Sequence, residues 1–261
     1  MELEDEAKKL VAYINSLGGG FQIRTKGPPS ERPSNEHIGA IIADATLSAR
    51  HNYDTQVKPR VTKLRSTYPE GATTSGFRRL MDRIELEELL MGWEKDSAKK
   101  LKQIQVRETA KFFANENIQD YSDLFKWMRK EENRRKLKKS INGIGDKTAD
   151  YYAVLVRDPE AVAIDKRISI FLYNAGIDTS KYSYKKKQTI VRLAAKRIGY
   201  EPLDLEQSIW HHNPKRSQKG GEMSEDNEKL VLQVRLPSQK MEQLKAVARQ
   251  EYGEEPDSLA K

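Results

Sequence analysis

A lysine and an aspartate eighteen residues apart are the side chains of this sequence best suited to chemistry. Lys147 lies two residues after the turn Gly143-Ile144-Gly145, and Asp165 stands at the start of a later predicted helix. An amine that has lost its proton is a nucleophile that forms Schiff bases, and a nearby carboxylate orients it or stabilises positive charge. Because a lysine has a reference pKa of about 10.4, this chemistry requires a site that lowers the pKa by desolvation or by nearby positive charge.

The turn before Lys147 is suited to holding an anion. Gly143 and Gly145 permit a tight turn whose backbone N–H groups point outward, and Ile144 is expected to anchor it between two packed helices. A second helix is predicted from Asp146, so its first N–H groups and positive dipole end add to the site. A DNA phosphate is the natural occupant, while a plain glycine stop between two helices is the alternative.

The stretch Ile141-Asn142-Gly143-Ile144-Gly145-Asp146-Lys147-Thr148-Ala149 resembles the helix-hairpin-helix motif of the endonuclease III superfamily of DNA glycosylases, L-P-G-V-G-x-K-T-A. Its glycines, lysine, threonine and alanine all match. In that superfamily an aspartate in V-D-T-H follows the lysine by eighteen positions, and Ala163-Ile164-Asp165-Lys166-Arg167 has its aspartate at the same spacing. The resemblance implies a two-lobed helical fold in which Lys147 is the nucleophile and Asp165 its carboxylate.

The same resemblance nominates residues that contact DNA. Leu47-Ser48-Ala49 is similar to the superfamily's L-S-A-Q, whose glutamine reaches the space left by the extruded base, and Arg50 replaces that glutamine here. Two departures stand at the hairpin, where Asn142 replaces a proline and Asp146 puts a negative charge beside the phosphate site. The expected DNA-binding residues are Gly143, Ile144, Gly145, Thr148, Arg50, Lys166 and Arg167.

The absence of cysteine excludes disulfides, thiolate zinc sites and cysteine-held iron–sulfur clusters. The resemblance therefore points to the cluster-free branches of the superfamily, such as the 8-oxoguanine glycosylases. In one such branch the domain ends in a helix reading L-D-L-x-x-W, to which Leu203–Trp210 is similar. The adjacent His211 and His212 point in different directions on a helix and lack carboxylate partners at ligand spacing. We predict no metal and no cofactor.

Apolar residues at helical spacing predict an all-α fold, with no convincing sheet before residue 212. Ser122 is the expected N-cap of its helix. The predicted helices cover 1–20, 35–48, 57–64, 84–91, 98–115, 122–127, 134–139, 146–156, 165–175, 185–198 and 205–211.

The glycosylase-like domain is expected to span 1–211, followed by a polar linker over 212–228 that is too poor in apolar residues to form a core. Residues 229–261 predict a short strand and a helix, which resemble the opening of a ribbon-helix-helix DNA-binding domain. That resemblance implies a dimer through the tail; without it the protein is expected to be a monomer.

Composition agrees with a DNA partner. Lys plus Arg exceeds Asp plus Glu by a net charge of +8, and the pI is about 9.3, which favours a polyanion. No apolar run approaches the ~20 residues that span a bilayer. The N-terminal MELEDEAKK is acidic where an export signal is basic, so a cytoplasmic location is expected.

These patterns predict a base-excision DNA glycosylase with AP lyase activity. Its expected substrate is double-stranded DNA that contains an oxidised or otherwise damaged base or an abasic site. Lys166 and Arg167 are expected to supply the positive charge that lowers the pKa of Lys147. Two alternatives remain open. In a monofunctional glycosylase, Asp165 activates water and Lys147 only binds. In a non-catalytic helix-hairpin-helix protein, Lys147 contacts a phosphate and Asp165 is a simple helix N-cap.

Overall fold

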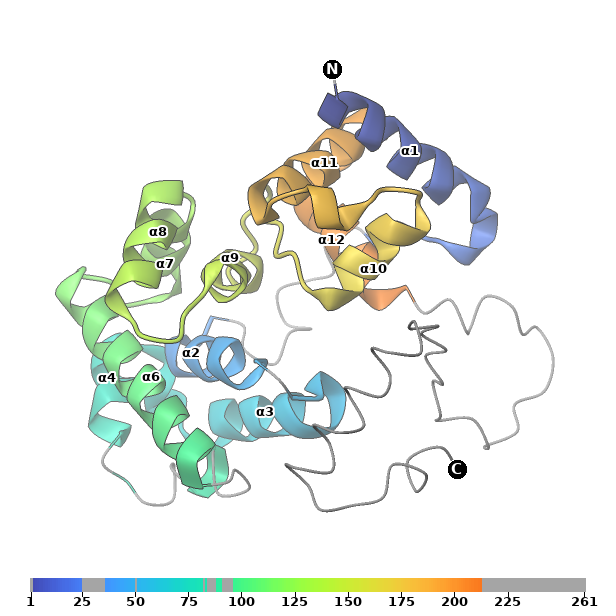
Figure 1. Cartoon of the computed structure of the whole chain (residues 1–261). Coiled ribbons are helices and arrows are strands. Elements are labelled where there is room, and N and C mark those ends of the chain that lie inside the picture. Colours follow the sequence, from blue (N-terminus) through green and yellow to red (C-terminus); the bar gives the residue numbers. More distant parts are fainter. Residues whose placement is uncertain are drawn as a thin grey trace, which may run out of the picture. The chain divides into compact units, whose positions relative to one another are not determined.

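The structure is a computed structural model that describes residues 2–24, 36–49, 51–81, 83, 88–90 and 96–212, except for the side chains of 96–99. Within these ranges the chain forms helices and turns with no strand, which confirms the all-α prediction for this part of the protein (Figure 1). None of the described helices is long and apolar enough to cross a bilayer. Two hydrophobic cores organise these helices.

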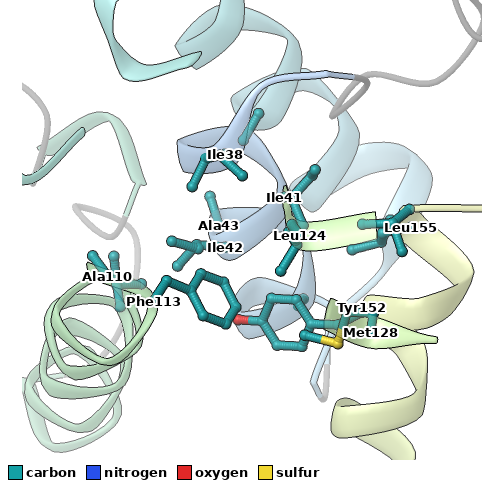
Figure 2. Close-up of a cluster of buried hydrophobic side chains, with 14 of the residues drawn as sticks. Ile38, Ile41, Ile42, Ala43, Ala110, Phe113, Leu124, Met128, Tyr152 and Leu155 are labelled. Atoms are coloured by element: carbon teal, nitrogen blue, oxygen red, sulfur yellow. The ribbon is translucent and has the colours of Figure 1, made fainter. Parts of the chain in front are cut away.

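The first core is built by the middle of the chain. Its elements are α2 (Ile38–Leu47), the π-helical turn η3 (Tyr53–Val57), α3 (Lys58–Thr67), η4 (Pro69–Ala72), α4 (Thr74–Leu80), α6 (Asp96–Asn115), α7 (Tyr121–Met128), α8 (Glu131–Ser140) and α9 (Asp146–Leu155). Helix α2 is buried along its whole length, because its run IGAIIADATL offers apolar residues on every side. Figure 2 shows its side chains among those of α6, α7 and α9, including Ile41, Ile42, Phe113, Leu124, Met128, Tyr152 and Leu155.

The second core joins the first helix of the chain to the last three. It contains α1 (Glu2–Ser16), α10 (Lys166–Asn174), α11 (Tyr184–Arg197) and α12 (Pro202–His211), with the short turns η1 (Gly18–Gly20) and η5 (Thr179–Lys181) nearby. Helix α1 lies against α11 (Figure 1), and its buried residues Ala7, Leu10 and Ile14 follow the helical spacing expected of one apolar face.

An irregular segment, 161–165, connects the two cores with a strand-like alternation. Ala161 and Ala163 belong to the first core, whereas Val162 and Ile164 belong to the second. Alternate side chains of an extended segment point to opposite sides, so one short run serves both cores. Asp165 follows directly, and its position therefore depends on the register of this segment.

Some expectations need correction or fall outside the description. Helix α7 begins one residue earlier than predicted, and Asp120 rather than Ser122 caps it by accepting a hydrogen bond from the N–H of Asp123. The helix predicted over 84–91 is described only at 88–90. Apart from His212, the predicted linker 212–228 and the tail 229–261 lie outside the described residues, as does Arg50.

The buried N-cap of α2 generates a prediction on stability. His37 is 4% exposed, its Nδ1 accepts from the N–H of Ala40 at 3.0 Å, and its Nε2 faces the carbonyl of Tyr68 at 2.9 Å. The two contacts are satisfied together by the neutral ring, and burial lowers the pKa of His37. Below the ordinary pKa of about 6.5, His37 takes up a proton in the unfolded chain more readily than in the folded protein. The stability that the neutral ring contributes is therefore present above about pH 6.5 and is lost as the pH falls through the lowered pKa.

We expect the free energy of unfolding to decrease as the solution is acidified below about pH 6.5. His37→Asn keeps an N-cap acceptor but does not titrate, so its unfolding free energy starts about 1 kcal/mol lower and varies less with pH. Denaturant titrations at a series of pH values measure both curves. Equal slopes for the two proteins would show that His37 is not the responsible group.

Candidate functional site

The glycine turn between α8 and α9 is anchored as the sequence predicts. Ile144 is 6% exposed and belongs to the first core. Gly143 has a φ of +84°, a backbone conformation that glycine adopts without strain. Gln105 of α6 donates from Nε2 to the carbonyl of Asn142 at 3.1 Å. The turn is therefore held from inside by an aliphatic side chain and from the side by an amide.

Ile144 is the buried residue of the turn, as its predicted anchoring role requires. Its N–H donates to the carbonyl of Ile141 at 3.2 Å, within the turn, and its side chain is buried. Within Gly143-Ile144-Gly145 the two glycines are the exposed residues. Asp146 pairs with Lys138 at 2.7 Å, so its negative charge beside the turn is balanced by α8.

Lys147 stands in the first turn of α9 with its amine partly withdrawn from water. Its Nζ lies 4.9 Å from the centre of the Tyr151 ring, one turn along the same helix. Burial lowers the pKa of Lys147, and the negative charges of Asp165, Glu206 and Asp44 oppose that effect. The side chain is thus placed to lose its proton more readily than a lysine in water.

Of the two expected causes of this pKa shift, desolvation and nearby positive charge, the structure supports desolvation. We expected positive charge from Lys166 and Arg167, but the groups that act on Lys147 by charge are carboxylates, and desolvation lowers its pKa. Lys166 is exposed on the first turn of α10. The guanidinium of Arg167 lies 4.4 Å from the centre of the Trp210 ring and donates to the carbonyl of Trp210.

Asp165 uses both carboxylate oxygens. Oδ1 accepts from the N–H of Ile168 at 2.8 Å, which makes Asp165 the N-cap of α10. Oδ2 accepts from Nε1 of Trp210 at 3.1 Å. The first bond is the one expected of a plain helix cap, but the second orients the carboxylate from a different helix, α12.

Lys147 and Asp165 line the same cavity of about 290 Å³. Three parts of the chain form its walls: the loop and turn after α2, the first turns of α9 with the segment before α10, and α12. The lining residues are Ser48, His51, Asn52, Tyr53, Asp54, Lys58, Lys147, Tyr151, Ala163, Asp165, Arg167, Glu206, Gln207, Trp210 and His211.

A fully buried aspartate of α2 organises the aromatic walls. Asp44 accepts hydrogen bonds from the hydroxyls of Tyr53 at 3.2 Å and Tyr151 at 3.1 Å, and from Ser48 at 3.1 Å. The Tyr53 ring in turn meets the edge of Trp210 at 5.7 Å between centroids. One carboxylate thus holds two tyrosines, and Tyr53 is linked to Asp165 through its contact with Trp210.

The other predicted site residues are placed differently. Thr148 is half-buried next to Lys147 but does not line the cavity, and Arg50 is outside the described residues although its neighbour His51 is in the wall. Sequence reasoning missed Tyr53, Tyr151 and Glu206. For Glu206, the similarity of Leu203–Trp210 to a superfamily helix was a signal, because that helix contributes one cavity wall. In the described part of the chain, no group of three or more histidines and carboxylates is arranged to hold a metal ion.

The burial of Lys147 generates a prediction on its titration. We expect its amine to react with a limiting acylating reagent at lower pH than an exposed control, Lys196, because its pKa is lowered by desolvation. Asp165→Asn removes a charge that raises this pKa, so the midpoint should move to still lower pH. Peptide mass spectrometry of labelling against pH measures both midpoints, and a Lys147 midpoint equal to that of Lys196 would contradict the expectation.

Comparisons with known proteins identify a family and show a distant structural likeness. No curated protein matches the sequence. The crystal structure of the Methanocaldococcus jannaschii 8-oxoguanine glycosylase/lyase in complex with a DNA 15mer containing 8-oxoguanine is similar at 19% identity and a TM-score of 0.48, over 84% of this chain and 93% of that one. The family described as "Domain of unknown function (DUF8548)" matches residues 9–214. Since this match spans well over half of the sequence, the chain belongs to that family.

Proposed function

We propose that this protein is a DNA glycosylase with AP lyase activity, which extrudes a damaged base from double-stranded DNA and attacks the sugar with Lys147. One observation carries the proposal: an amine whose pKa is lowered by burial and an oriented carboxylate line a single cavity. A base in a duplex cannot reach such a cavity, so the nucleotide must rotate out at a cost of a few kcal/mol.

In the proposed reaction the neutral amine of Lys147 forms a bond to C1′ while the glycosidic bond breaks. The base leaves with the bonding electron pair and takes up a proton. Asp165 stabilises the positive charge that develops on the sugar and accepts a proton from the attacking nitrogen. Opening of the sugar ring then gives a Schiff base, from which loss of the 3′ phosphate cuts the strand.

The cavity has the size and chemistry for one planar base. Its volume of about 290 Å³ lies near the lower end of the ~300–1,000 Å³ range of ligand pockets. The rings of Tyr53, Tyr151 and Trp210 offer apolar faces, and Glu206 and Gln207 offer polar groups for the base edge. An oxidised base is our first candidate, because the hairpin and the lack of cysteine resemble the cluster-free branch of the superfamily.

The DNA backbone would be held outside the cavity. The exposed Gly143 and Gly145 stand next to the N-terminus of α9, where helix N–H groups favour an anion. Lys166 and Arg167, on the first turn of α10, would contact phosphates near the extruded nucleotide. We therefore place the hairpin on one side of the lesion and α10 on the other.

Burial of Lys147 disfavours the role of a simple phosphate contact, since a lysine with that role keeps its ammonium in water. The two remaining mechanisms differ in what attacks the sugar. With lysine as nucleophile, base release is followed by a covalent intermediate and strand cutting. With water activated by Asp165, base release occurs without either.

Borohydride trapping tests the nucleophile. We expect wild-type protein to form a covalent adduct with a duplex containing 8-oxoguanine, thymine glycol, uracil or an abasic site, with at least one of these substrates. Lys147→Gln should form no adduct, because it lacks the amine, while Lys196→Gln, on the exposed end of α11, should trap as wild type does. Base release without adduct or nicking would select the water mechanism, and no base release from any substrate would leave a DNA-binding role.

Asp165→Asn separates a catalytic carboxylate from a helix cap. Asparagine caps helices as well as aspartate does, so a purely structural residue should tolerate the change. A carboxylate that stabilises charge should not, and we expect single-turnover base release to fall by about 10²-fold or more. Quenched reactions at saturating protein measure this rate, with thermal unfolding as the check on the fold. A wild-type rate in the variant would reduce Asp165 to a cap.

A further inference from the structure

A second polar cluster lies outside the cavity lining, where α9 meets α8 and α11, and reaches the segment that carries Asp165. Asp150 stands one turn after Lys147 on α9 and pairs with Arg134 of α8, Nε to Oδ1, at 2.9 Å. Gln188 of α11, which is 5% exposed, donates from Nε2 to Oδ2 of Asp150 at 2.9 Å. Tyr184, one turn earlier on α11, interacts electrostatically with the carboxylate of Asp150.

The same two residues of α11 hold the backbone of the connecting segment. The hydroxyl of Tyr184 accepts from the N–H of Ile164 at 3.2 Å. The amide of Gln188 donates to the carbonyl of Val162 at 2.5 Å. Buried backbone groups require hydrogen-bond partners. Here Tyr184 and Gln188, one helical turn apart on α11, provide partners for the N–H of Ile164 and the carbonyl of Val162.

This pairing fixes the register of the segment. Val162 and Ile164 point into the second core while Ala161 and Ala163 point into the first, so a slip by one residue would exchange the two sets. Tyr184 and Gln188 bond only the backbone of the set that points to the second core. The residue after Ile164 is Asp165, whose carboxylate is thereby placed on the cavity side.

We propose that Tyr184, together with Gln188 and Asp150, is a positioning residue that sets the placement of the Asp165 carboxylate relative to the amine of Lys147. The cluster is connected to both side chains. Asp150 lies on the same helix as Lys147, and Tyr184 hydrogen-bonds Ile164, the residue before Asp165. The catalytic meaning of this placement rests on the proposed function. The placement itself is independent of that function, because the Asp165 carboxylate acts on the pKa of Lys147 in the protein without DNA.

The test uses Tyr184→Phe in the full-length protein, with Tyr182→Phe as a matched control. Tyr182 lies two residues earlier, and its hydroxyl donates to Glu2 and Glu6 of α1 at 3.1 Å each, so its loss weakens the same core without touching the segment 161–165. Gln188→Met is the second variant, which keeps the length of the side chain and removes the amide. Thermal unfolding identifies the temperature at which every variant is folded.

The first readout needs no activity. Movement of Asp165 away from Lys147 removes part of the negative charge that raises the lysine pKa, so the pH midpoint of Lys147 acylation should shift downward in Tyr184→Phe and Gln188→Met. Tyr182→Phe should keep the wild-type midpoint. If both cluster variants keep it as well while they unfold more easily, the cluster is only structural and the inference is overturned.

The second readout is trapping on a duplex with an abasic site. At saturating protein we expect the single-turnover rate constant to fall about 10- to 100-fold in Tyr184→Phe, while its Kd for the DNA and the rate of Tyr182→Phe stay at wild-type values. Wild-type protein that forms no adduct, with a shifted midpoint in the variant, would refute the lyase function and leave the positioning intact. A variant with normal rate and midpoint would refute the positioning alone.

Discussion

The removal of one amine from water is the constraint on which the rest of this site depends. A charged group loses much of its solvation when it is buried, and neighbouring carboxylates recover only part of that loss. Around Lys147 the three carboxylates favour the ammonium form, yet desolvation outweighs them and lowers the pKa. The protein therefore holds a side chain in a position that costs stability.

Fixed partners around the cavity keep this costly arrangement in one geometry. Asp44 holds Tyr53 and Tyr151, and Trp210 holds Asp165 while the guanidinium of Arg167 covers its ring. The helices that form the cavity walls are packed into one of the two hydrophobic cores. Side chains from different walls are joined by direct hydrogen bonds. A site of this kind loses little entropy when a ligand enters, because its side chains are already in place.

Features formed by neighbouring residues could be predicted from the sequence, whereas contacts between distant segments could not. The glycine turn, the helix after it and the cap at Asp165 follow from patterns within a few residues, and the superfamily spacing joined Lys147 to Asp165. Tyr53 and Tyr151 carry no such signal, because their common partner Asp44 is about a hundred residues from one of them. A lone carboxylate inside the apolar run IGAIIADATL was the available hint. The positive charge expected from Lys166 and Arg167 is not among the charges that act on Lys147, because Lys166 is exposed and the guanidinium of Arg167 lies over the Trp210 ring.

The pairing of α1 with α11 has a consequence for biosynthesis. The hydrogen bond between Tyr182 and Glu6 joins residues 176 positions apart, so at translation rates of about 5 to 20 residues per second the first helix waits roughly 10 to 35 s for its partner. The helices of the first core emerge in one continuous stretch and are free to fold during that interval. Until α11 has been synthesised, the apolar stripe of Ala7, Leu10 and Ile14 stays uncovered.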